Sequence, residues 1–165
     1  MKKSFWLLSL LWVLFLSWCG WSMNIVEYND SLVDIVKECT DSNQELFKNF
    51  NTNEVSVDSI LQSIQDSITI CQGSQVKASQ VWNYEKDSSL KDAVVELLAL
   101  EIDYLQKFSA TSRYRNIDNI TEEDREEYNW IVSDLNETQN SLNQQFTKLQ
   151  EVQEAFAAKH ALKLE

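Results

Sequence analysis

Histidine and cysteine, the residues that most often bind metals or act as nucleophiles, are scarce in this chain. There is one histidine, His160, and there are three cysteines, Cys19, Cys39 and Cys71. A structural zinc site usually takes four such ligands, and a two-metal carboxylate bundle takes two Glu-x-x-His units, whereas no glutamate lies three residues before His160. A Ser-His-Asp or Cys-His site would also need this one histidine, which we expect to cap a helix or to face solvent. The sequence therefore predicts no enzyme activity, no catalytic residue, no metal and no other cofactor.

Acidic residues are plentiful, and they give the chain of 165 residues a net charge of −12. A surface this negative repels nucleic acid, so we expect no nucleic-acid partner. The acidic run at 122–127 has the composition of a loose divalent-ion site, but a solvated helix start explains it better, since negative charge complements the helix dipole there. A Gly-rich phosphate loop is excluded because the chain has only two glycines, Gly20 and Gly73.

The N-terminal residues have the order of a secretory signal. Met1-Lys2-Lys3 is basic, the stretch 5–16 is almost entirely apolar, and small residues follow, among them Cys19 and Ser22. The apolar stretch is shorter than the roughly 20 residues of a membrane span, although its extension through Trp21 leaves an uncleaved anchor as an alternative. We therefore expect the protein to be exported.

The stretch Leu16-Ser17-Trp18-Cys19-Gly20 resembles the lipobox of bacterial lipoproteins, in which the cysteine receives a lipid through a thioether and the chain is cut just before it. Leu16 and Ser17 match the motif, whereas Trp18 stands where a small residue is usual. The resemblance implies a signal peptide over 1–18, lipidation of Cys19 and a mature domain over 19–165. Two or three acyl chains would hold that domain firmly at the membrane. A cut after Ser22, which would release a soluble protein, remains an alternative.

Long helices are indicated by the near absence of residues that break them. The chain has no proline and two glycines, and apolar residues recur at intervals of three and four, as on one buried helical face. The pattern predicts four amphipathic helices joined by short polar turns, at about 24–50, 56–82 and 89–115, and from about 121 to a basic end that contains Lys159, His160 and Lys163. Gly73 weakens the second, and Thr121 with Asp124 resembles a capping box at the start of the fourth. We predict an all-α fold, an antiparallel up-down four-helix bundle preceded by an N-terminal signal or anchor helix.

Cys39 and Cys71 occupy the apolar faces of the first two predicted helices. If those helices form a hairpin turning near residues 53–55, the two cysteines lie within about one helical turn of each other. An oxidising compartment would preserve a disulfide at that position. The sequence favours this bond, and two buried thiols are the alternative.

Two aromatic pairs lie near predicted helix ends. Trp82 and Tyr84 close the second helix, and Tyr128 and Trp130 open the fourth. An up-down order places the pairs at opposite ends of the bundle, so they do not share a pocket. We expect them to pack in the core.

Three segments of the chain resemble small uncharacterised surface lipoproteins of bacteria that contain a long-helix bundle. They are Glu27-Tyr28-Asn29-Asp30-Ser31-Leu32-Val33, Ser89-Leu90-Lys91-Asp92-Ala93 and Gln153-Glu154-Ala155-Phe156-Ala157-Ala158-Lys159-His160. The resemblance implies a bundle at the cell membrane or outer surface, and it assigns no functional residue.

Two functions are compatible with these features. The first is a membrane-tethered envelope lipoprotein with a structural or protein-interaction role, whose partners are the membrane and other envelope proteins. The second is an extracytoplasmic ligand-binding or sensory helical bundle, similar to the periplasmic domains of chemoreceptors. Such receptors normally have a second membrane span and a cytoplasmic region, which this sequence lacks, so we expect the first function.

Overall fold

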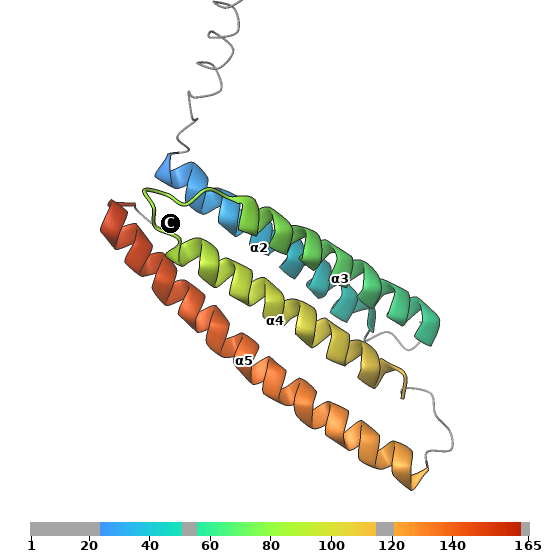
Figure 1. Ribbon diagram of the computed structural model, residues 1–165. Helices are drawn as coiled ribbons and strands as arrows, with labels where there is room; N and C mark the ends of the chain where they lie inside the picture. The colour runs from blue at the N-terminus through green and yellow to red at the C-terminus, as the bar shows by residue number, and fades with distance from the viewer. Residues whose placement is uncertain (1–23, 51–55, 115–120, 163–165) are drawn as a thin grey trace, which may run out of the picture.

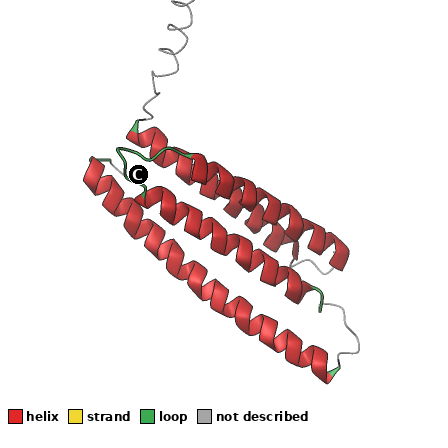
Figure 2. Cartoon of the chain, viewed as in Figure 1, coloured by secondary structure: helices red, strands yellow, loops and turns green. Residues whose placement is uncertain are grey.

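The computed structural model describes residues 24–50, 56–114 and 121–162. They form four helices, α2 (Ile25–Phe50), α3 (Val57–Gln80), α4 (Ser89–Ser112) and α5 (Glu122–His160). No strand occurs within these ranges, only an isolated bridge between Tyr84 and Asp87 in the α3–α4 connection (Figure 2). The predicted all-α class is confirmed for this part of the chain. The expected signal or anchor helix lies outside the described residues.

Consecutive helices run in opposite directions and pack side by side (Figure 1). Close packing joins α2 to α3, α3 to α4 and α4 to α5, and α2 also contacts α4. The start of α2, the α3–α4 connection and the end of α5 lie together at one end of the molecule. By contrast, α2 and α5 are not closely packed along their length. The seam between these two helices is therefore the loosest in the bundle.

Local polar groups define where the helices begin. The Thr121 hydroxyl accepts a hydrogen bond from the Asp124 backbone at 3.1 Å, and the Asp124 carboxylate accepts one from the Thr121 backbone at 3.0 Å, so the predicted capping box is confirmed. At the start of α4 the side chain of Ser88 makes no capping bond. The carboxylate of Asp87 instead accepts a hydrogen bond from the Ser89 backbone at 3.0 Å.

The core consists of the apolar faces of all four helices, and Leu98 and Leu105 of α4 are fully buried in it. α3 continues without a break through Gly73, where an added Cβ would meet nothing within 4 Å. The glycine therefore serves no close approach of another helix. The apolar residues of its own helix hold α3 in place, since tertiary packing supplies most helix stability in proteins.

None of the four described helices combines the length and the hydrophobicity needed to cross a lipid bilayer.

Candidate functional site: an apolar groove between α2 and α5

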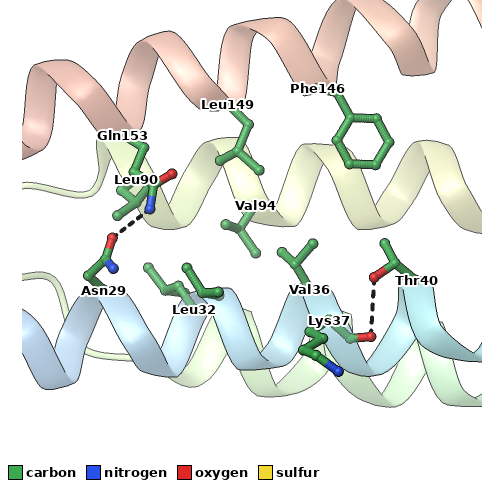
Figure 3. A pocket seen from close by; sticks show the side chains of 11 residues that line it. Asn29, Leu32, Val36, Lys37, Thr40, Leu90, Val94, Phe146, Leu149 and Gln153 are labelled. Carbon is green, nitrogen blue, oxygen red and sulfur yellow. Dashed lines mark hydrogen bonds between the residues drawn. The ribbon is translucent and has the colours of Figure 1, made fainter. Parts of the chain in front are cut away.

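The loose seam between α2 and α5 contains a cavity of about 320 Å³. α2 forms one wall, α5 the opposite wall, and α4 the floor (Figure 3). Apolar side chains dominate the lining, which comprises Asn29, Leu32, Val33, Val36, Lys37, Thr40, Leu90, Val94, Phe146, Leu149 and Gln153. Ligand pockets often have this composition, with a hydrophobic wall and a few polar groups, and helical bundles often place them between helices.

Polar side chains mark both ends of the groove. At one end the Gln153 side chain donates a hydrogen bond to the Asn29 side chain at 2.9 Å, which links α5 to α2 (Figure 3). Ring contact between Tyr28 and Phe156, with centroids 5.4 Å apart, joins the same two helices beside this bond. Lys37 and Thr40 lie toward the other end. The groove is therefore closed at the Asn29 end and polar at the Lys37 end.

Apolar residues on the rim of the groove face solvent. Val33 on α2 is 45% exposed and Phe146 on α5 is 39% exposed, whereas Leu32, Leu90 and Val94 at the bottom are buried. A large apolar side chain left exposed beside an apolar hollow is a common mark of a binding surface. The groove thus has a buried apolar floor that continues onto an accessible apolar edge.

Of the described residues that line the groove, only Lys37 is charged. Its ammonium forms an ion pair with Asp41 one turn along α2, and this hydrogen bond raises the pKa of Lys37 above its usual value. The side chain is therefore cationic at neutral pH. The hydroxyl of Thr40 is already engaged, since it donates to the Lys37 carbonyl at 3.2 Å.

The groove offers apolar burial and one positive charge. The sequence reasoning missed it because it expected each apolar face to be covered by a neighbouring helix. Val33 and Phe146 were the available signals. Val33 widens the apolar face of α2 beyond what a narrow core stripe requires, and Phe146 lines the same groove from α5.

Cys39 and Cys71 lie elsewhere, between α2 and α3, with their sulfur atoms 1.97 Å apart in a disulfide and their Cα atoms 4.7 Å apart. Both side chains are fully buried, so they are closed to solvent chemistry. Asn43 lies beside them, with its amide nitrogen 3.8 Å from the Cys39 sulfur and 2.8 Å from the carboxylate of Glu101. Burial raises the pKa of Glu101 above its usual value. This part of the core therefore holds a disulfide and a carboxylate that share one amide.

We expected His160 to cap a helix or to face solvent, and the structure shows neither: the C-cap of α5 is Ala161, and the His160 side chain is buried. Its side chain is 7% exposed, and its ring nitrogens lie 3.4 Å from the carboxylates of Glu85 and Asp87 in the α3–α4 connection. A hydrogen bond from Lys159 holds the pKa of Asp87 well below its usual range. Since these contacts join the end of α5 to the α3–α4 connection, the cluster has a structural explanation.

The two aromatic pairs lie at opposite ends, as predicted, but their tryptophans are not in the core. Trp82 is 90% exposed and Trp130 is 68% exposed. Tyr84 packs against Phe156 and His160 with ring centroids 6.0 and 5.1 Å apart. The apolar spacing predicted a buried Trp82, but α3 ends at Gln80 and the chain turns away before this residue.

Two further expectations concern lipid and metal. Cys19, the predicted lipidation site, lies outside the described residues. Within the described ranges, no three His, Cys, Asp or Glu side chains are arranged to hold a metal ion. Glu122 and Glu123 are exposed in the first turn of α5, where they complement the helix dipole.

No protein family, curated protein or solved structure matches this chain.

Proposed function

We propose that the protein is an exported envelope lipoprotein, tethered to a membrane through Cys19, with a structural or protein-interaction role and no catalysis. The observation that carries this proposal is the fully buried Cys39–Cys71 pair at bonding distance. Disulfides persist in oxidising compartments and are rare in the cytosol. The pair thus supports export independently of the N-terminal signal pattern.

The position of the tether fits this role. Cys19 precedes Ile25, the first residue of α2, by six residues, which can span at most about 20 Å when fully extended. A lipid on Cys19 would therefore keep one end of the bundle close to the membrane. That end contains the start of α2, the α3–α4 connection and the end of α5 (Figure 1).

The division of the chain follows from the same proposal. Residues 1–18 would be a lipoprotein-type signal peptide, and 19–165 a mature bundle that resembles the small bacterial surface lipoproteins. The whole chain has a net charge of −12, and without Lys2 and Lys3 the mature part would carry −14. This acidic surface would repel anionic headgroups and keep the helices upright in solvent on a short tether. The exposed faces of the bundle would be left for other envelope proteins.

Metabolic labelling tests the tether. Bacteria expressing the full chain are grown with an alkynyl fatty acid, and the label on the purified protein is measured. We expect the wild type to carry label and Cys19→Ser to carry none. The matched control is the double variant Cys39→Ser/Cys71→Ser, which should keep the label. An unlabelled wild type would contradict lipid anchoring.

A second function, binding of a small ligand by the bundle, is favoured by the groove between α2 and α5. Its apolar floor and exposed apolar rim are what a ligand-binding bundle needs and what a purely structural rod does not. The test is native mass spectrometry of the protein extracted from membranes without detergent. A small molecule that stays bound to the wild type supports this function, and an empty protein in all preparations argues against it.

A further inference from the structure

We infer that the groove between α2 and α5 binds one long-chain fatty acid, with its hydrocarbon chain in the groove and its carboxylate at Lys37. This inference rests on the second proposed function, ligand binding by the bundle, and it names the ligand class. It does not depend on lipidation of Cys19.

The first argument is the shape of the cavity. Along α2 its lining extends from Asn29 to Thr40, which is about three helical turns or about 16 Å. A groove lined over this length suits an extended chain better than a compact ring system.

The second argument is the distribution of polarity along the groove. Between its two ends the side chains are aliphatic or aromatic, with Leu32, Val36 and Val94 below and Leu149 and Phe146 above (Figure 3). A ligand with a polar group in its middle would bury that group without a partner, which is costly. The ligand must therefore be apolar along its whole length.

The third argument is charge. Among the described residues that line the groove, Lys37 alone is charged. Its side chain is 64% exposed and points away from the apolar floor (Figure 3), so a headgroup bound to it lies at the outer edge of the groove, in contact with water. An ammonium has three N–H donors, so Lys37 can bind a ligand carboxylate while it keeps Asp41. At the other end, Asn29 is buried and hydrogen-bonded to Gln153, which leaves no room for a charged group. The ligand is thus oriented with its methyl end toward Asn29.

These features also select among the sources of an acyl chain. A phospholipid has two long chains, which need more volume than the 320 Å³ of the cavity. The lipid on Cys19 would approach from the start of α2, where the Asn29–Gln153 hydrogen bond and the Tyr28–Phe156 ring contact close the groove. A single-chain fatty acid entering past the exposed edge at Val33 and Phe146 meets neither obstacle.

The test is photo-crosslinking of the full chain in its own membranes with a diazirine-bearing long-chain fatty acid, followed by peptide mapping. In the wild type we expect label within 29–40 and 146–153. Val36→Trp fills the groove and should lower this labelling at least tenfold. Val76→Trp is the matched control, because Val76 is an exposed valine of α3 outside the groove, and it should label as the wild type does.

A second pair of variants tests the carboxylate. Lys37→Gln should reduce labelling by the fatty acid roughly two- to fivefold, the range of an exposed ion pair, and should leave labelling by the corresponding fatty alcohol unchanged. Lys48→Gln, on the same helix but outside the groove, should change neither.

The outcomes separate the inference from the function on which it rests. Label confined to residues 1–22, or equal label in Val36→Trp and the wild type, overturns the groove assignment. If the groove is labelled in the wild type but not in Cys19→Ser, the occupant is the lipid on Cys19, and the assignment to a free fatty acid is overturned. If a different small molecule remains bound in native mass spectrometry, ligand binding stands and only the fatty acid is wrong.

Discussion

Reduction of the Cys39–Cys71 bond should destabilise the bundle without unfolding it at room temperature. The bond joins α2 to α3 across 32 residues of sequence. In the chain-entropy account, freeing a loop of that length lowers the free energy of unfolding by about 3.7 kcal/mol. For a domain of this size that corresponds to a fall in Tm of about 10–15 °C. The loss is large because the bond restricts the unfolded chain, whereas the core between the helices stays intact.

The assay is thermal unfolding followed by circular dichroism at 222 nm, with and without reductant. The helical signal at 25 °C should be the same in both samples, and only the midpoint should move. Cys39→Ala/Cys71→Ala is the matched control, since its midpoint should not respond to reductant. Cys19→Ser should behave as the wild type does. A wild-type midpoint that is unchanged by complete reduction would refute the reasoning.

Four other substitutions test the core and the end of the bundle. Glu101→Gln should raise the free energy of unfolding by about 1 kcal/mol at pH 7, because it removes the cost of a buried ionised carboxylate. The pKa of Glu101 is raised in the folded protein, so the wild type loses stability as pH rises from the unfolded pKa of 4.5 through the folded pKa. The stability that Glu101→Gln gains over the wild type should therefore vanish below pH 4.5, as measured by urea titrations. Asp87→Asn should lower the free energy of unfolding by about 1–2 kcal/mol at pH 7, since the lowered pKa of Asp87 contributes stability above pH 3.8 that is lost on acidification. A variant that is destabilised equally at pH 7 and pH 2 would contradict this. Leu98→Ala should cost about 2–5 kcal/mol in the same urea assay, whereas Trp82→Ser should stay within about 0.5 kcal/mol because the indole is exposed.

Helix positions were predictable from the sequence because they depend on local signals. The absence of proline, the three-and-four spacing and the Thr121–Asp124 box placed the helices within a few residues of their observed bounds. The Cys39–Cys71 register followed from one assumption, a hairpin turning near residues 53–55. These features involve neighbouring residues or neighbouring helices, where periodicity carries the information.

The groove and the cluster around His160 were not predictable in this way. Apolar spacing shows which face of α2 turns inward, but it does not give the distance between α2 and α5, which are far apart in the sequence. His160 is covered by a connection in which Glu85 and Lys86 have positive φ angles of 47° and 70°. No glycine marks that backbone conformation in the sequence. Trp82 is exposed for the same reason, since it lies in this connection and not in a helix.

The intact mass of the protein, extracted from membranes and measured without reduction, tests the central claim most directly. We predict a chain that begins at Cys19, carries added acyl mass, and weighs two hydrogens less than the fully reduced sum. A chain that begins at Met23 without acyl mass, or one that retains Met1, would contradict the lipid tether. A mass equal to the reduced sum would contradict the disulfide that supports export.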